Sequence, residues 1–348
     1  MKQTQYGTRG GGELALIEEI RRRAARNRLG RVRLGIGDDC ALLAARTGEE
    51  LAVTTDLSIA GRHFRLDWHQ PESVGHRALA RGLSDLAAMG ARPVAAFLSL
   101  GLPRELTVEA GRRRAGSRAG GDSWVRRFLD GLLDLAEAYK TPLAGGDLAE
   151  SPVAAADIVL CGAVPRGRAL LRSGARAGDL LYVTGALGGA AAGIARLAEL
   201  ASTGRAVPPR IPKKLEGMLA SHLYPQPRIA QGLWLQRRGL ASAAIDLSDG
   251  LSTDLAHLCE ESGVAAEVDA GLLPLGPGAT LAQALHGGED YELLFTAPAA
   301  ARLPRAIASV PVTGIGRIVR ARRGQPALTL ITSQGRENLR PQGWEHFR

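Results

Sequence analysis

Cysteine and aromatic residues are scarce in this sequence, and each scarcity excludes a class of protein. The chain has three cysteines, Cys40, Cys161 and Cys259, which are odd in number, far apart and without C-x-x-C spacing. They argue against a disulfide framework and a zinc site, and each is most simply a small buried side chain. Aromatic residues make up 4% of the chain, so the core must consist mainly of Ala, Leu, Val and Ile.

Two nucleotide-binding motifs are also missing from the sequence. No stretch matches G-x-x-x-x-G-K-[ST], which excludes a P-loop, and none gives a convincing G-x-G-x-x-G between a strand and a helix. The segment from Gly185 to Gly189 is rich in glycine before a helix, but its spacing is wrong for a dinucleotide site. Any nucleotide site must therefore be built in another way.

Long hydrophobic runs are absent as well. The most apolar stretch, Pro93 to Leu102, is too short to cross a bilayer. The segment from Met1 to Gly12 is polar and Gly-rich, without the apolar region of a signal peptide. We therefore expect a cytoplasmic protein that has no membrane partner.

Lysine is nearly absent although the chain is strongly basic, with a net charge of +9 and a pI near 10.1. Among the 44 basic residues, the lysines are Lys2, Lys140, Lys213 and Lys214, and all others are arginine. The arginines are scattered and lack interleaved aromatic residues for stacking on bases. We therefore expect no nucleic-acid partner, although a basic nucleic-acid-binding protein is kept as an alternative. A general positive field also attracts anionic phosphates.

Segments with strand and helix patterns alternate along the chain, which indicates a mixed α/β fold. The pattern predicts helices at 13–26, 71–89, 124–139, 190–200, 228–238 and 251–261. It predicts strands at 51–55, 94–102, 158–164, 180–184, 243–245, 264–268, 291–296, 312–318 and 328–331. The Arg- and Gly-rich segment 109–123 is expected to be a flexible surface loop.

The length of 348 residues favours two domains. Ser151-Pro152 is a plausible boundary between them. It gives an N-terminal α/β domain over residues 1–150 and a C-terminal α/β domain over residues 151–348.

Carboxylates recur where short apolar or Gly-rich segments end. The segments are Gly35-Ile36-Gly37-Asp38-Asp39, Thr54-Thr55-Asp56, Leu83-Ser84-Asp85, Gly145-Gly146-Asp147, Asp246-Leu247-Ser248-Asp249 and Gly287-Gly288-Glu289. Any single acid could be a turn former or a helix cap. If the set converges, its mutual repulsion implies bound cations, and Mg²⁺ prefers oxygen ligands. The residues suggest a Mg²⁺-dependent ATP enzyme without a P-loop.

Three other side chains have both a structural and a functional interpretation. His63 is a structural histidine or a contact for a phosphate. Arg172 is one more solvated arginine, or it pairs with phosphate oxygens through its planar fork. Trp344 covers the core near the C-terminus or stacks on a substrate ring.

Taken in order, these motifs resemble those of the thiamine-monophosphate kinases. They are GIGDDCALL, TTD followed by GRHF, LSDLAAMGARP, GGD, RSGARAGD, YVTGALGGAAAG, IDLSDGLSTDL and GGEDYELLF, and the resemblance extends from Leu34 to Phe347. This family belongs to a superfamily with aminoimidazole ribonucleotide synthetase, selenophosphate synthetase and a hydrogenase maturation factor. A sister activity, an ATP-dependent synthetase or ligase with a different small-molecule acceptor, is the alternative.

The resemblance implies a two-domain fold like that of aminoimidazole ribonucleotide synthetase, with N-terminal strands that pair across a homodimer. It implies a transferase that uses ATP and several Mg²⁺ ions to convert thiamine monophosphate to thiamine diphosphate by in-line phosphoryl transfer. No general base is expected, because the acceptor is already an anionic phosphate. Metal ions and positioning would supply the catalysis.

The resemblance also implies roles for individual residues. The expected metal ligands, direct or through water, are Asp39, Thr54, Thr55, Asp56, Asp85, Asp147, Asp246 and Asp249. The expected ATP contacts are Gly146, Arg172 and Ser248, and the expected thiamine monophosphate contacts are His63, Glu289 and Trp344. Residues 111–123 look like an insertion beside the helix that approaches the nucleotide in the family. The residues that contact adenine therefore stay unassigned.

Overall fold

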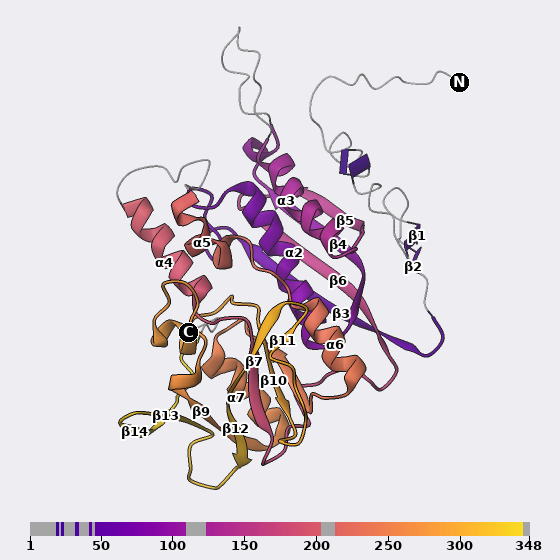
Figure 1. Cartoon of the computed structure of the whole chain (residues 1–348). Coiled ribbons are helices and arrows are strands. Elements are labelled where there is room, and N and C mark those ends of the chain that lie inside the picture. Colours follow the sequence, from indigo (N-terminus) through magenta and orange to yellow (C-terminus); the bar gives the residue numbers. More distant parts are fainter. Residues whose placement is uncertain are drawn as a thin grey trace, which may run out of the picture.

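The structure, a computed structural model, describes residues 19–20, 22–23, 32–34, 42–43, 46–108, 123–202 and 213–343. Two predicted site residues, Asp39 and Trp344, lie outside these ranges, as does nearly all of the predicted loop 109–123. The described chain forms two α/β units, coloured indigo to magenta and orange to yellow (Figure 1). The mixed α/β class predicted from the alternating pattern is confirmed.

The N-terminal unit is built on a four-stranded sheet with the order β3-β6-β4-β5. The β4–β5 pair is parallel, and β6 runs antiparallel to both β3 and β4. These strands are β3 (Glu49–Ile59), β4 (Arg92–Leu102), β5 (Leu143–Glu150) and β6 (Ala155–Pro165). Because β6 completes this sheet, the N-terminal unit continues past the boundary expected at Ser151-Pro152. We therefore move the proposed boundary to the segment after Pro165.

Two helices, α2 (Pro71–Ala88) and α3 (Trp124–Ala138), cover one face of this sheet (Figure 1). Pro71 suits the first turn of α2, where its fixed φ favours the helix and no hydrogen bond is lost. Leu79, Leu83 and Leu86 of α2 are buried against the sheet. On β3 the residues alternate, so that Leu51, Val53 and Leu57 are exposed on the other face.

The C-terminal unit contains a larger sheet with the order β14-β13-β9-β12-β7-β10-β8, and β11 pairs with β12 beside it. Among the described strand pairs of this sheet, only β13–β9 is parallel. The strands are β7 (Leu180–Thr184), β8 (Ala243–Asp246), β9 (Val264–Asp269), β10 (Leu293–Ala297), β11 (Ala306–Ile307), β12 (Val310–Arg320), β13 (Leu328–Thr332) and β14 (Gly335–Asn338). The helices are α4 (Gly189–Ser202), α5 (Lys213–Leu223), α6 (Ile229–Arg238), α7 (Leu251–Ser262) and α8 (Leu281–His286).

The smaller elements complete the description. A separate two-stranded sheet joins β1 (Val32–Leu34) to β2 (Leu42–Leu43), and 3₁₀ turns form at η2 (Arg104–Leu106) and η3 (Ala270–Leu272). No helix in the described ranges combines the length and the apolar character that a membrane span requires.

Helix α2 also contacts the C-terminal unit and thereby fixes the two units against each other. A Cβ added to Gly232 of α6 would lie 1.9 Å from the carbonyl oxygen of Ala87, so the two helices approach as closely as glycine permits. His76 contacts the carbonyl oxygen of Pro225 at 2.7 Å, through its Nε2 atom. Contacts near both ends of α2 therefore hold it against the C-terminal unit.

The pattern located most helices and longer strands to within a few residues but missed α5, α8, β1, β2, β5, β11 and β14. Helix α5 had a readable signal, because Leu215, Met218, Leu219 and Leu223 follow helical spacing. Helix α8 begins with a capping box, in which Thr280 and Gln283 exchange hydrogen bonds. The strand predicted at 291–296 begins at Leu293, because the chain before it turns through left-handed conformations.

Candidate active site

A cleft of about 460 Å³ lies between the two units. Its walls come from β3 and α2 on one side and from α4, α5 and the loops after β8 and α8 on the other. The predicted site residues that line it are Asp56, His63, Asp85, Asp246, Ser248, Asp249 and Glu289. The fold thus brings together acids that are separated by up to 233 positions in the sequence, from Asp56 to Glu289.

Three of these acids form the centre of the cleft, and local structure explains the position of each. Asp56 shares the inward face of β3 with Thr54, two residues earlier. Asp85 lies in the last turn of α2 and accepts a hydrogen bond from Thr54 Oγ1. Asp246 ends β8 and accepts a hydrogen bond of 2.7 Å from Ser84 Oγ. We call Asp56, Asp85 and Asp246 the acid cluster.

The acid cluster is electrostatically strained without a cation. Burial raises the pKa of Asp56 to about 6, and repulsion from Asp85 adds to the rise. The same two causes raise the pKa of Asp246 to about 7. Burial also raises the pKa of Asp85, against the hydrogen bond from Thr54. Buried carboxylates that repel one another are stabilised by a nearby positive charge.

The donor chemistry of the acid cluster fits Mg²⁺. Its carboxylates and the Thr54 hydroxyl are hard oxygen donors, which this ion prefers. Within the described ranges, no three His, Cys, Asp or Glu side chains are already grouped closely enough to hold a metal ion. Mg²⁺ usually keeps several waters and binds through one or two carboxylates and the phosphates of its substrate.

The loop that carries Ser248 and Asp249 is held by an acid that the sequence analysis missed. Asp254 is 2% exposed, and its Oδ2 atom accepts 3.1 Å hydrogen bonds from the backbone N–H groups of Asp249 and Gly250. Burial, with repulsion from Asp246, raises its pKa to about 8. An acid in the first turn of α7 is the signal that could have identified it.

Two predicted ligands face away from the cleft or lie outside it. The side chain of Thr55 is exposed on the opposite face of β3 from Thr54. Asp147 lies on β5, at the far edge of the sheet from β3 and roughly 14 Å away across three strand spacings. With Gly146 it lines a second cavity of about 100 Å³, beside Ile20 and Leu98. A single chain does not bring Asp147 to the acid cluster.

Arg172 and Arg81 bring positive charge to the acid cluster. Arg172, whose side chain is exposed, offsets part of the rise that burial causes in the pKa of Asp85 and of Asp246. Arg81 lines the cleft, with Nη2 3.4 Å from Asp56 Oδ1. The sequence analysis treated Arg81 as one of many arginines, although it lies one helical turn before Asp85.

The segment that carries Glu289 has an unusual backbone. Glu289 and Tyr291 both have a left-handed conformation, with φ of 67° and 51°. Hydrogen bonds from their backbone N–H groups reach the carbonyl oxygens of Ser248 (2.8 Å) and Leu247 (2.9 Å). Between them, the carboxylate of Asp290 accepts hydrogen bonds from the backbone N–H groups of Gly188 (2.6 Å) and Ala190 (3.1 Å). Such strain persists where surrounding contacts determine the conformation, as at ligand-binding sites.

Two family models match the two halves of the chain. They are AIR synthase related protein, N-terminal domain, over residues 37–164, and AIR synthase related protein, C-terminal domain, over residues 176–327. The first match ends within β6 and the second begins before β7, consistent with a boundary after Pro165.

Individual relatives match over nearly the full length. The thiamine-monophosphate kinase of Escherichia coli K12 is 40% identical over 97% of this chain and 98% of its own. The crystal structure of the enzyme of that name from Stenotrophomonas maltophilia has a TM-score of 0.75 and 36% identity, and covers 92% of this chain and 96% of its own. The structure described as AaThiL complexed with AMPPCP and TMP has a TM-score of 0.71 and 31% identity, over 99% of this chain and 100% of its own. A hydrogenase maturation protein, HypE, shares the fold at 18% identity and a TM-score of 0.69.

Proposed function

This chain belongs to the thiamine-monophosphate kinase family, and we propose that the cleft between its two units is where thiamine monophosphate receives a phosphoryl group from ATP. The reaction gives thiamine diphosphate and ADP, and the enzyme is a phosphotransferase with a phosphate group as acceptor. The convergence of Asp56, Asp85 and Asp246 with Glu289 in one cleft is the observation that carries the proposal. A relative that binds AMPPCP and TMP supports it.

The chain's own residues bind and orient the reactants. We propose that Asp56, Asp85, Asp246 and Thr54 hold Mg²⁺, with Asp249 holding a further ion. When bound, Mg²⁺ neutralises the phosphates and stabilises the charge on the transferring group. We propose that Thr55 contributes its backbone to the ligand set, because its side chain faces away from the cleft. The place of Asp39 in the ligand set rests on the resemblance. No side chain has to remove a proton, because the acceptor phosphate is already an anion.

The remaining proposed contacts follow the two walls of the cleft. Ser248 lines the cleft and the charge of Arg172 acts on Asp85 and Asp246, so we assign both to ATP. Gly146 lies with Asp147 outside this cleft, and its assignment to ATP rests on the resemblance. His63 and Glu289 line the cleft and are assigned to thiamine monophosphate. The assignment of Trp344 to the same substrate rests on the resemblance alone. An aromatic face there would attract the cationic thiazolium ring.

A homodimer accounts for two features that a single chain leaves unexplained. Leu51, Val53 and Leu57 are 51%, 61% and 47% exposed on the open face of β3, where an apolar surface favours association. Asp147 lies across the sheet from the acid cluster of its own chain. It would reach an acid cluster only if a second copy of the chain supplied that cluster. We propose that sheet pairing between two copies covers this face and completes each site.

We propose that the enzyme acts in the cytoplasm. The described cysteines, Cys161 and Cys259, are free and buried, and unpaired thiols of this kind suit a reducing compartment.

A coupled assay with product identification tests the proposed function. The purified protein is incubated with ATP, Mg²⁺ and thiamine monophosphate, and the product is identified by mass. Thiamine diphosphate should form only when all three are present. A folded protein that binds ATP but gives no thiamine diphosphate would overturn the proposal, and a screen of other phosphorylated acceptors would follow.

A further inference from the structure

A buried cluster of polar side chains lies directly behind Glu289. It consists of His69 from the loop after β3, Arg77 from α2 and His222 from α5, and we call it the His–Arg cluster. Their residues are 4%, 5% and 2% exposed, and all three are therefore shielded from water. Of the three, His222 reaches the wall of the cleft, and no role in binding has so far been given to any of them.

We propose that Arg77 and His222 are positioning residues that fix the Glu289 carboxylate as an anion, aimed into the cleft, where it binds the positively charged part of thiamine monophosphate. This inference rests on the proposed function, because it concerns the binding of the same acceptor. Arg77 and His222 themselves act through Glu289 rather than on the reacting atoms.

The contacts of Arg77 support this role first. Its Nη2 atom donates a hydrogen bond of 2.6 Å to Glu289 Oε1, and its Nη1 atom lies 3.2 Å from His222 Nε2. A guanidinium this deeply buried requires a carboxylate partner, since an unpaired buried charge is strongly unfavourable. The carboxylate that pairs with Arg77, that of Glu289, also lines the cleft. One interaction therefore pairs the buried cation with a carboxylate and orients the cleft-facing anion.

The histidines provide a second constraint, because the contact between His222 and Glu289 favours one order of protons. His222 Nδ1 lies 3.4 Å from Glu289 Oε2, and a carboxylate at that position requires Nδ1 to carry the proton. His222 Nε2 is then an acceptor, and His69 Nε2, 2.9 Å away, must donate to it. In this order His69 Nδ1 accepts from the backbone N–H of Arg65 at 3.1 Å, and the carbonyl oxygen of Arg65 lies 3.2 Å from the same nitrogen. Both imidazoles are neutral in this arrangement, and a proton points at Glu289.

The electrostatics agree with this order. Burial lowers the pKa of His69 to about 3, with repulsion from Arg77 adding to the effect. Burial and Arg77 likewise lower the pKa of His222. Burial alone would raise the pKa of Glu289, but Arg77, His222 and Arg81 outweigh it and hold that pKa well below its usual range. Glu289 is therefore an anion and the imidazoles are neutral at physiological pH.

The backbone completes the positioning. Glu289 has a left-handed conformation that its hydrogen bond to Ser248 fixes, so neither its main chain nor its carboxylate is free to turn away from the cleft. Binding groups that are fixed before the ligand arrives lose less conformational entropy on binding. A carboxylate held in this way favours a cationic ring over a neutral one of the same shape.

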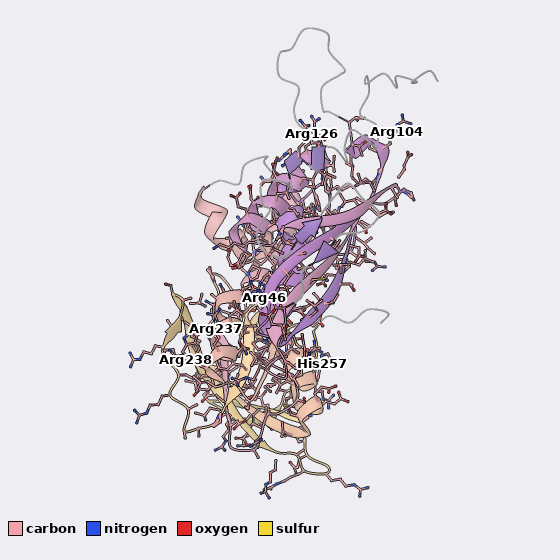
Figure 2. All side chains as sticks on the ribbon, turned by 90° about the vertical axis from the view of Figure 1, so that its right-hand side faces the viewer. Arg46, Arg104, Arg126, Arg237, Arg238 and His257 are labelled. Carbon is pink, nitrogen blue, oxygen red and sulfur yellow. The ribbon has the colours of Figure 1, made fainter. Side chains whose placement is uncertain are left out.

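The experiment compares Arg77→Met, Arg77→Lys and His222→Phe with two matched surface variants, Arg237→Met and His257→Phe. Arg237 and His257 are exposed on the C-terminal unit (Figure 2). Steady-state kinetics give separate KM values for the two substrates, and calorimetry measures thiamine monophosphate binding without turnover. We expect Arg77→Met and His222→Phe to weaken thiamine monophosphate binding by about tenfold to a hundredfold, as for loss of a charged hydrogen bond. The KM for ATP should change by less than about threefold, and Arg77→Lys should recover much of the loss because it keeps the charge.

A pH series adds a measurement that a merely structural role would leave unchanged. In Arg77→Met the half-buried Glu289 loses its main counter-charge, so its pKa should rise and thiamine monophosphate binding should weaken from pH 8 to pH 6. The wild-type enzyme should show no such loss from this group. The charged and titratable groups around Glu289 are Arg77, Arg81, His69, His222, Asp290 and Tyr291. The same series in Arg237→Met controls for their contributions.

A double variant keeps the inference testable if Arg77→Met folds poorly. Glu289→Gln removes the partner charge, so Arg77→Met combined with Glu289→Gln leaves no buried carboxylate without its cation. If Arg77 acts through Glu289, adding Arg77→Met to Glu289→Gln should cause no further loss of thiamine monophosphate binding. Additive losses, or an unchanged affinity in a folded Arg77→Met protein, would overturn the inference. A wild-type protein that binds thiamine monophosphate but does not phosphorylate it would overturn the proposed function alone.

Discussion

Arg81 Nη2 lies 3.4 Å from Asp56 Oδ1, so the chain supplies a cation of its own to the edge of the acid cluster. Desolvation disfavours the charged guanidinium, but the neighbouring Tyr291, Asp56, Glu289 and Asp85 outweigh this and raise the pKa of Arg81. The guanidinium therefore stays charged, and it partly neutralises the acids whether or not a metal ion is bound.

Replacement of Arg81 should lower the stability of the metal-free protein and raise its affinity for metal. In Arg81→Met the acids lose a permanent counter-charge, so the melting temperature in EDTA should fall by a few degrees. The affinity for Mg²⁺ should rise by about threefold to tenfold, because the remaining negative charge attracts the ion more strongly. Thermal melts across a Mg²⁺ titration measure both effects, with Arg237→Met as the control. Weaker Mg²⁺ binding in Arg81→Met would instead mean that Arg81 helps to organise the metal ligands.

Asp85 should be required for metal binding but not for folding. Asp85→Asn keeps the shape of the side chain and removes one of three mutually repelling buried charges. We expect an unchanged or slightly higher melting temperature in EDTA, loss of the Mg²⁺-dependent increase, and turnover reduced by about a hundredfold or more. Asp134→Asn, at an exposed position on α3, is the matched control. A fully active Asp85→Asn enzyme would remove Asp85 from the ligand set.

Two inactive variants should restore activity when mixed, if each site needs Asp56 from one copy and Asp147 from another. In a heterodimer of Asp56→Asn with Asp147→Asn, one site carries both changes and the other carries neither. With random exchange of subunits, about a quarter of wild-type activity should return. Activity is measured after the two proteins have been mixed under conditions that allow exchange. If Asp56 and Asp147 act within one chain, the mixture should stay inactive.

The buried His69 should make stability fall in acid. Burial lowers its pKa from 6.5 to about 3, so the unfolded chain binds a proton in this interval that the folded chain does not. The contribution of the neutral His69 to the free energy of unfolding is therefore complete above pH 6.5 and is lost as the pH falls towards 3. Between pH 6.5 and pH 5 the free energy of unfolding should therefore fall by about 2 kcal/mol because of His69.

Urea denaturation at the two pH values, in wild type and in His69→Gln, isolates this contribution. Glutamine keeps a polar side chain but does not titrate, so the difference in free energy of unfolding between the two pH values should shrink by about 2 kcal/mol in the variant. His257→Gln should leave the difference unchanged. Equal pH dependence in wild type and His69→Gln would show that His69 is protonated in the folded chain as easily as in the unfolded one.

The sequence was most informative where chemistry and local pattern coincide. Asp56, Asp85 and Asp246 were recognised because each follows an apolar segment, and the fold does bring them to one cleft. Of the three, Asp246 is the last residue of its element, since β3 continues to Ile59 and α2 to Ala88. Strand order is different, because it depends on long-range pairing that no local pattern encodes. Nothing around Asp147 indicates that β5 forms the edge of the sheet opposite β3.

The positive residues of the site were harder to find for a compositional reason. In a chain whose basic residues are nearly all arginine, Arg77 and Arg81 do not stand out from the solvated majority. Their spacing was the available signal, since they lie eight and four residues before Asp85 on one helix. His222 was missed with α5 itself, although the apolar spacing of that helix was readable.

The left-handed backbone around Glu289 has a consequence for engineering this enzyme. Glu289, Asp290 and Tyr291 are each fixed by main-chain or carboxylate hydrogen bonds, so substitutions there would disturb the backbone as well as the surface of the cleft. The adjoining part of the same wall is formed by α4, where Ala190, Ala191 and Ile194 line the cleft. Changes in side-chain volume at Ala191 can therefore alter which acceptors fit while the binding carboxylate keeps its place. Redesign of acceptor range is best begun on α4.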